Sequence, residues 1–128
     1  MIAGVGIDVV DVARVHALLA RKEARAVKRL FTDAEVAYCA SKAVPHRHYA
    51  ARVAAKEACF KALSGTPDAR GIGWREIEVQ LDDIGRPTIA LHGRAELRAR
   101  ELGVARIWVS LSHSDTTAAA TVILETDP

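Results

Sequence analysis

A run of small residues in the middle of the chain places the strongest limit on the fold. The segment RVAAKEACFKAL, residues 52–63, is rich in alanine. At 100° per residue, Ala51, Ala55, Ala58 and Ala62 line up on one side of a helix. Small side chains let a neighbouring backbone pack close to that side. We expect a helix over residues 46–64, ended by Gly65, with its alanine side tightly packed.

The other side of this helix carries charged residues. Glu57 lies almost opposite the alanines, Lys61 follows one turn later, and Lys56 lies about a quarter turn away from Glu57. One interpretation is a solvated Glu–Lys pair at i,i+4, worth only a few tenths of a kcal/mol. The residues that flank Glu57 on its own side are mostly apolar, however, which is unusual for a fully solvated face.

Hydrophobic periodicity and turn signals predict the remaining elements. Residues 2–10 predict a buried strand, and Asp11 is a candidate N-cap for a helix that follows in two pieces, the second over residues 22–30. Thr32 and Glu35 form a capping-box pattern for a short helix. The later segments predict, in order, strands at 74–82 and 88–92, a helix at 93–103, and strands at 105–112 and 116–124. The expected fold class is α+β, a single domain over residues 1–128 with a mainly antiparallel sheet packed against helices.

Composition narrows the cellular setting. Half of the 128 residues are hydrophobic, but no apolar run approaches a membrane span, and the first ten residues lack the basic region of a signal peptide. Cys39 and Cys59 are twenty residues apart without a CxxC pattern. We therefore expect reduced thiols in a cytoplasmic protein, rather than a disulfide framework or a zinc site.

Asp8 lies in the apolar first strand, where an isolated carboxylate would be costly. A structural hydrogen bond to a nearby backbone turn would satisfy it. Alternatively, Asp8 and Glu57 together could hold a hard divalent cation such as Mg²⁺, which takes one or two carboxylates and completes its shell with water and phosphate oxygens. Lys56 and Lys61 would then neutralise further phosphate charge. This interpretation requires the fold to bring these residues together.

The segment SLSHSD, residues 110–115, ends a predicted strand with hydroxyl groups and His113. Hydroxyls and backbone amides at such a point suit an anion, although an ordinary hairpin turn with an exposed histidine has the same composition. The chain contains neither a GxxxxGK[ST] loop nor a GxGxxG fingerprint, which argues against the standard nucleotide-binding folds.

Basic residues gather in the first predicted helical region. Residues 11–29 contain six bases and two acids, whereas the net charge of the whole chain is only +2. The spacing places one set of bases on a single face if the helix is continuous, namely Arg14, Arg21, Arg25 and Lys28. That face suits an acidic protein helix or a nucleic-acid backbone, and a solvated helix face is the plainer alternative.

Three separated blocks of the sequence together resemble the holo-acyl-carrier-protein synthases, the short single-domain class of 4′-phosphopantetheinyl transferases. The blocks are GVGIDVVDVARV near the N-terminus, FTDAE followed by RVAAKEACFKAL in the centre, and VSLSHSDTTAAA near the C-terminus. Their order and spacing match from end to end. The segment SGTPDARGIGW departs from the simpler glycine-rich turn common in that family.

The resemblance implies an activity. Coenzyme A would donate its 4′-phosphopantetheine group to a serine of apo acyl carrier protein, releasing adenosine 3′,5′-bisphosphate and supporting fatty acid biosynthesis. Asp8 and Glu57 would hold Mg²⁺, and Lys61 would act with them in catalysis. The serine proton would go to Glu57 or to a metal-bound water. The residues implied to contact coenzyme A are Arg52, Lys56, Lys61, Gly65, Ser112 and His113.

The resemblance also implies partners. The acidic carrier protein would dock on Arg14, Arg21, Arg25 and Lys28. The resemblance further implies a homotrimer with active sites at the subunit boundaries. Asp8 and Glu57 would come from one chain and the Ser112–His113 segment from its neighbour.

Two other hypotheses remain: a non-catalytic module that binds a coenzyme or nucleotide, and a small nucleic-acid-binding domain. The first would not need both carboxylates, and the second leaves the spacing of Asp8, Glu57 and His113 unexplained. We therefore expect neither a nucleic-acid nor a membrane partner.

Overall fold

The computed structural model describes residues 1–64 and 71–128, apart from the side chains of residues 22–24. The helices and strands follow the predicted order, and the α+β class is confirmed. Their bounds are β1 (Ile2–Asp11), α1 (Val12–Leu30), α2 (Asp33–Ala40), α3 (Pro45–Leu63), a 3₁₀ turn (Trp74–Glu76), β2 (Ile77–Leu81), β3 (Pro87–Leu91), α4 (Gly93–Glu101), β4 (Val104–His113) and β5 (Thr117–Thr126).

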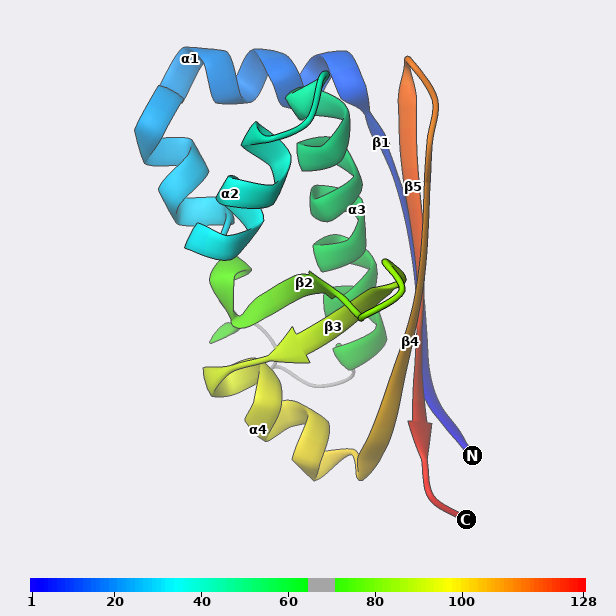
Figure 1. Ribbon diagram of the computed structural model, residues 1–128. Coiled ribbons are helices and arrows are strands. Elements are labelled where there is room, and N and C mark those ends of the chain that lie inside the picture. The colour runs from blue at the N-terminus through cyan, green and yellow to red at the C-terminus, as the bar shows by residue number, and fades with distance from the viewer. Residues whose placement is uncertain (65–70) are drawn as a thin grey trace.

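All strand pairing is antiparallel among the described residues, but the strands form two sheets rather than one. The larger sheet has the order β1-β5-β4, and the smaller one is the β2-β3 hairpin. Helix α3 runs along one face of the larger sheet, while α1, α2, the hairpin and α4 lie beyond it (Figure 1). The central helix is therefore covered from both sides.

The alanine side of α3 packs against the larger sheet, as predicted. Ala55 and Ala58 are fully buried there. Gly4 and Gly6 of β1 face the same side, where a Cβ atom would overlap the backbone carbonyls of Ala62 and Ala58, respectively. Only glycine permits so close an approach of strand and helix. This contact fixes the height of β1 over α3, and with it the position of the next inward residue, Asp8.

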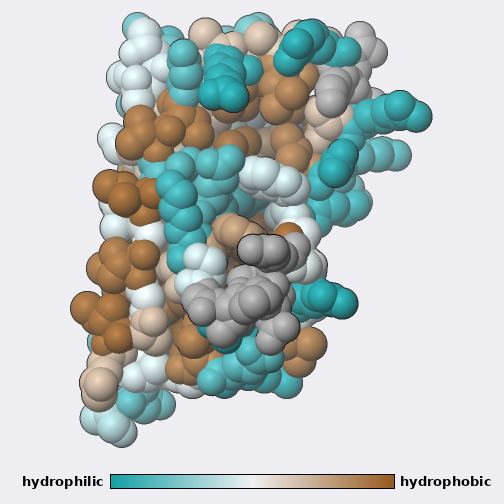
Figure 2. Space-filling view, turned by 180° about the vertical axis from the view of Figure 1, so that it is seen from behind, coloured by the Kyte–Doolittle hydropathy of each residue, from teal (hydrophilic) through white to brown (hydrophobic). Residues whose placement is uncertain are grey.

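The prediction that β1 is a buried strand was wrong for its outer face. Val5, Ile7 and Val9 point away from α3 and are 57–62% exposed. Trp108 of β4 is also large, apolar and exposed. Apolar side chains gather along the edge of the molecule formed by this sheet (Figure 2). The outward face of β1 is thus apolar, whereas Gly4, Gly6 and Asp8 lie on its inward face.

The N-terminal helical region is one helix, not the two predicted pieces. Asp11 caps α1, since its side chain accepts a hydrogen bond from the Ala13 amide at 3.2 Å. The helix continues to Leu30 and changes direction partway along (Figure 1). The predicted capping box of α2 is confirmed, because Thr32 and Glu35 each bond to the other's backbone amide.

No helix within residues 1–64 and 71–128 is both long enough and apolar enough to cross a membrane.

Candidate active site

Asp8, Glu57 and Lys61 come together where β1 crosses α3. Asp8 points inward from β1, opposite Ala120 of β5, and is 9% exposed. The Lys61 ammonium donates to Asp8 Oδ1 at 2.9 Å and to the backbone carbonyl of Ile7 at 3.1 Å. Glu57 lies one turn before Lys61 on α3, close enough to Asp8 for the two carboxyl groups to influence each other's ionisation. The predicted convergence of two carboxylates and a lysine is therefore present in the geometry.

The electrostatics of this cluster favour an additional cation. Burial and the neighbouring Asp8 carboxylate raise the pKa of Glu57 to about 7, while Lys61 and Arg14 act in the opposite direction. Asp8 Oδ2 is buried and has no hydrogen-bond partner among the described residues. Two close carboxylates, one with a buried oxygen unused, form a donor set suited to a hard cation that keeps most of its water shell.

A larger protein-made metal cage is not formed. Within the described part of the chain, no group of three or more histidine, cysteine, aspartate or glutamate side chains could hold a metal ion. The two carboxylates would supply only part of a coordination shell, which is the arrangement expected when phosphate and water supply the rest.

A pocket of about 370 Å³ opens beside the carboxylates. One wall is the charged side of α3, and the other is the segment that leads into β2. The lining residues are Lys56, Glu57, Phe60, Lys61, Ile72, Gly73, Trp74 and Ile77. The pocket therefore combines a charged rim with an apolar interior, as small-molecule sites commonly do. Sequence reasoning missed the apolar wall, because no local pattern showed that the segment before β2 folds back over α3.

Lys56 does not offer its charge to the pocket, contrary to the prediction that it contacts phosphate. Its side chain is 1% exposed, and its ammonium donates to Glu35 Oε1 and to the backbone carbonyls of Trp74 and Ile77. These three bonds use the full donor capacity of an ammonium group. The helical wheel indicated a direction for Lys56 but could not show that the chain provides acceptors there.

Arg52, which the family resemblance implied to contact coenzyme A, lies on the opposite side of α3 from Lys61, because nine residues correspond to two and a half helical turns. Its guanidinium stacks over the Tyr38 ring at 4.2 Å and its Nε is buried without a hydrogen-bond partner among the described residues. Within one chain, Arg52 and Lys61 therefore cannot contact the same phosphate group from one side of the helix.

Histidines and arginines form a second cluster around Arg52. The rings of His48 and His113 are 5.3 Å apart, and Arg47 bonds Asp115 at 2.6 Å. Burial lowers the pKa of His48, and the charges of His113 and Arg52 lower it further. This concentration of positive charge suits an anion. Ser112 is exposed beside His113 at the end of β4.

Gly65, the remaining residue predicted to contact the coenzyme, lies outside the described residues.

The predicted basic residues of α1 are all exposed: Arg14, Arg21, Arg25 and Lys28. Among the described side chains none of them forms an ion pair. Arg21 and Arg25 line a shallow hollow together with Arg29. Arg14 is close enough to Glu57 to influence its pKa. The basic surface therefore begins at the carboxylate cluster and extends along α1.

Comparison with known proteins identifies the class to which this fold and site belong. The sequence model of the 4′-phosphopantetheinyl transferase superfamily matches residues 4–122. The chain therefore belongs to that superfamily.

The relatives identify the type within it. A holo-[acyl-carrier-protein] synthase of Geobacter sulfurreducens is 46% identical over 125 residues, covering 98% of each chain. The protein of the same name from Anaeromyxobacter dehalogenans is 47% identical over 128 residues, covering 98% of this chain and 97% of that one. The expected likeness to the holo-acyl-carrier-protein synthases is confirmed, as is the enzyme class, phosphopantetheinyl transferase.

Solved structures of holo-[acyl-carrier-protein] synthases have the same fold as this chain. The holo-[acyl-carrier-protein] synthase of Neisseria meningitidis superposes with a TM-score of 0.86 at 27% identity, covering 98% of this chain and all of that one. The Helicobacter pylori enzyme, solved in complex with coenzyme A, has a TM-score of 0.80 at 25% identity, covering 94% of this chain and 99% of that one.

Proposed function

We propose that this protein transfers 4′-phosphopantetheine from coenzyme A to a serine of an apo acyl carrier protein. In this reaction the serine oxygen forms a bond to the β-phosphorus of coenzyme A. The bond from that phosphorus to the oxygen bridging the two phosphates breaks, and adenosine 3′,5′-bisphosphate leaves. The observation that carries the proposal is the Asp8–Glu57–Lys61 cluster at the rim of a pocket with an apolar interior. A non-catalytic coenzyme-binding module would need the pocket but not the paired carboxylates.

Asp8 and Glu57 would hold Mg²⁺ in this reaction. The unpartnered Asp8 Oδ2 and the raised pKa of Glu57 support this assignment, because both indicate missing positive charge. When bound, the ion would orient the pyrophosphate and offset the negative charge that develops on the leaving phosphate.

Lys61 would stabilise charge on the transferring phosphoryl group. It is 55% exposed at its side chain, so its ammonium can exchange one protein contact for a phosphate oxygen without a large rearrangement. The serine proton would go to Glu57 or to a water molecule held in the cluster.

The adenosine phosphate end of coenzyme A would bind the cluster of Arg52, Ser112 and His113. In one chain this cluster and Asp8 lie on opposite flanks of α3, since β1 and β4 are on opposite sides of β5. We therefore propose a homotrimer in which a neighbouring chain brings its Ser112–His113 segment to the carboxylates. The exposed row of Val5, Ile7 and Val9 supports such an assembly.

The exposed bases of α1 would dock the carrier protein, whose own charge is strongly acidic. The charge of Arg14 acts on the pKa of Glu57, so a carrier bound along α1 would present its serine in the region of the carboxylates. Electrostatic attraction of this kind mainly raises the association rate. Modified carrier protein would then serve fatty acid biosynthesis.

Reversing the charge of Arg14 and Arg25 tests this docking surface. We expect the Arg14→Glu, Arg25→Glu variant to raise the KM for the carrier protein by about 10- to 100-fold, because two attractive contacts become repulsive. Calorimetric binding of coenzyme A should stay within about twofold of wild type. Similar losses on both substrates would argue against a separate carrier surface.

A direct assay tests the activity. The protein is incubated with coenzyme A and apo acyl carrier protein, with Mg²⁺ or with excess chelator, and the carrier is weighed by mass spectrometry. A mass gain equal to the phosphopantetheine group, dependent on Mg²⁺, is expected. Binding of coenzyme A without any transfer would favour the non-catalytic module.

A further inference from the structure

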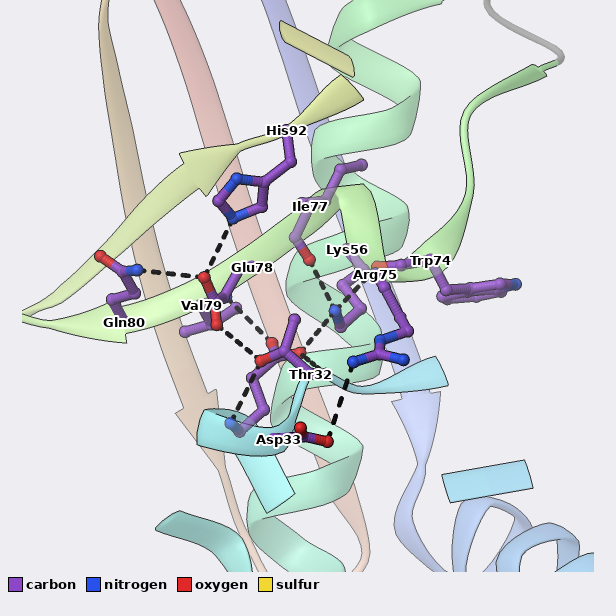
Figure 3. A network of polar contacts seen from close by, with 11 residues as sticks. Thr32, Asp33, Lys56, Trp74, Arg75, Ile77, Glu78, Val79, Gln80 and His92 are labelled. Atoms are coloured by element: carbon purple, nitrogen blue, oxygen red, sulfur yellow. Dashed lines mark hydrogen bonds and ion pairs between the residues drawn. The ribbon is translucent and has the colours of Figure 1, made fainter. Parts of the chain in front are cut away.

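Lys56 connects the two walls of the pocket. It belongs to α3, which forms one wall, and its ammonium donates to the backbone carbonyls of Trp74 at 2.8 Å and Ile77 at 2.6 Å in the other wall. Figure 3 shows these bonds converging on the Lys56 nitrogen from the turn before β2 and from the first residue of β2. The side chain thus spans the base of the pocket and links its walls at two points.

Glu35 supplies the third bond and the balancing charge. Its Oε1 accepts from Lys56 at 2.8 Å and from the Thr32 amide at 2.9 Å, while its Oε2 accepts from the Val79 amide at 2.9 Å. The Glu35 side chain has no exposed surface. One carboxylate therefore ties α3, the start of α2 and β2 to a common point.

A second carboxylate, that of Glu78, forms hydrogen bonds on the side of this wall that faces away from the pocket. Glu78 of β2 accepts from the Thr32 hydroxyl at 2.6 Å and from the Gln80 amide at 3.1 Å, and His92 lies 3.0 Å away (Figure 3). The hairpin is thereby held to the N-terminus of α2. The wall that contains Trp74 and Ile77 has polar anchors on both its sides.

A buried ion pair such as Lys56–Glu35 adds little to the stability of a fold. Removing two charges from water costs free energy that their attraction often only just recovers, and apolar pairs of similar size frequently stabilise a fold as well. Burial lowers the pKa of Lys56, and the Glu35 carboxylate opposes that shift. What directional bonds add, and apolar packing does not, is a fixed geometry between the elements they join.

We propose that Lys56, balanced by Glu35, is a positioning residue that sets the separation of the two pocket walls and so the affinity for coenzyme A. The inference rests on the proposed function for its ligand. Lys56 does not touch the ligand in this proposal. It acts by holding the main chain at Trp74 and Ile77 at a fixed distance from Glu57 and Lys61.

Steady-state kinetics with Lys56→Met test the proposal, since methionine fills similar space without donors. We expect the KM for coenzyme A to rise about tenfold, while kcat at saturating coenzyme A changes less than about threefold. Glu35→Gln should raise the same KM by about threefold, because it keeps an acceptor but removes the charge. The double variant should be no worse than Lys56→Met, as expected for residues acting as one unit.

Arg98→Met is the matched control. Arg98 is also a buried cation that bonds a main-chain carbonyl of α3, that of Leu63 at 2.9 Å, but it does not line the pocket. Its loss should lower the melting temperature and leave the KM for coenzyme A within about twofold of wild type. A KM raised equally by Arg98→Met and Lys56→Met would reduce Lys56 to a general stabilising residue and overturn the proposal.

Hydrogen exchange of the ligand-free proteins gives a readout independent of the reaction. Lys56→Met should speed exchange in residues 72–79 more than in β4 and β5. Unchanged KM together with unchanged exchange there would refute the positioning role. If Lys56→Met does not fold, Glu35→Gln decides by the same criteria. Wild-type protein that neither binds coenzyme A nor transfers its arm would instead refute the proposed function, and the exchange result would still report on the wall.

Discussion

The proximity of Asp8 and Glu57 gives each carboxylate properties that neither would have in water. Asp8 is nearly buried and is held by Lys61, whereas Glu57 lies against Asp8 and keeps its proton to about pH 7. Like charges at short range cannot both ionise without cost, so the pair is poised to exchange one proton for a cation. Two predictions at the scale of residues follow from this arrangement.

The first concerns the charge of Glu57. Glu57→Gln should lower the rate of transfer by at least about 100-fold, because an amide can neither ligate a hard cation well nor accept the serine proton. Folding should be intact, since the substitution removes a repulsion between neighbouring acids. Mass spectrometry of the carrier gives the rate, and thermal unfolding reports on the fold.

Glu96→Gln serves as the matched control, since Glu96 is a carboxylate on α4 that pairs only with Arg100 among the described residues. It should transfer at the wild-type rate. An unfolded Glu57→Gln protein would show that Glu57 has a structural role, and full activity would remove it from the mechanism.

The second prediction concerns pH. Because the pKa of Glu57 is about 7, Mg²⁺ must displace a proton at lower pH. The apparent affinity for Mg²⁺ should therefore fall by up to about tenfold for each pH unit below 7. Calorimetric titration with Mg²⁺ at several pH values measures this, and Glu57→Gln should abolish most of the dependence. An affinity that is flat through this range would exclude Glu57 as a ligand.

The same shift has a defined sign for the metal-free protein. The folded pKa lies above the ordinary value of 4.5, so the contribution of Glu57 to stability is complete below pH 4.5 and is lost as the pH rises through about 7. Mg²⁺ should restore stability at the upper end of this window, since it binds the folded state.

At the scale of elements, β1 packs against α3 at a distance that only glycine allows. Gly6→Ala should destabilise the fold by about 1–3 kcal/mol, because the new methyl group would overlap the Ala58 carbonyl and push the strand away. Urea unfolding measures the loss. Gly73→Ala is the control, since its Cβ would meet only Glu76 at 4.0 Å and its effect should be small. Equal stability of the two variants would mean that β1 can shift without cost.

The elements were largely predictable because their signals are local. The capping box at Thr32 and the alanine stripe of α3 each depend on residues only a few positions apart, and both were confirmed. The strand predicted over residues 74–82 begins only at Ile77, because Trp74–Glu76 forms a 3₁₀ turn. The sequence pattern alone left open whether Asp8 and Glu57 meet, and the family resemblance implied that they do. The sequence could not predict which residues far apart in the chain form hydrogen bonds or ion pairs with each other.

Lys56 shows this limit most clearly. Its acceptors come from residues 18 and 21 positions away, and no periodicity points to them. The division of the strands into two sheets and the opposite placement of Arg52 and Lys61 have the same origin. The second of these was available from the helical wheel, because nine residues place two side chains on opposite sides.

At the scale of the whole molecule, the two charged clusters on either flank of α3 make assembly testable. Glu57→Gln and His113→Ala should each be weakly active alone. When the two variants are coexpressed, some interfaces pair an intact Glu57 with an intact His113, and activity should recover to about one quarter of wild type for random mixing at interfaces of a closed ring. No recovery in verified mixed oligomers would mean that one chain completes its own site.

Strand β1 alternates between an inward carboxylate and an outward apolar row. Asp8 points inward to the carboxylate pair, while Ile7 and Val9, on either side of it, point outward with most of their surface exposed. Any partner that immobilises the outward row must also restrain the backbone that carries Asp8. Because coupling between two binding equilibria is reciprocal, a cation bound at Asp8 would raise the affinity between subunits by the same factor by which subunit association raises the affinity for the cation. Diluting the protein, which dissociates the subunits, should consequently lower the affinity for the metal ion even though Asp8 and Glu57 are unchanged.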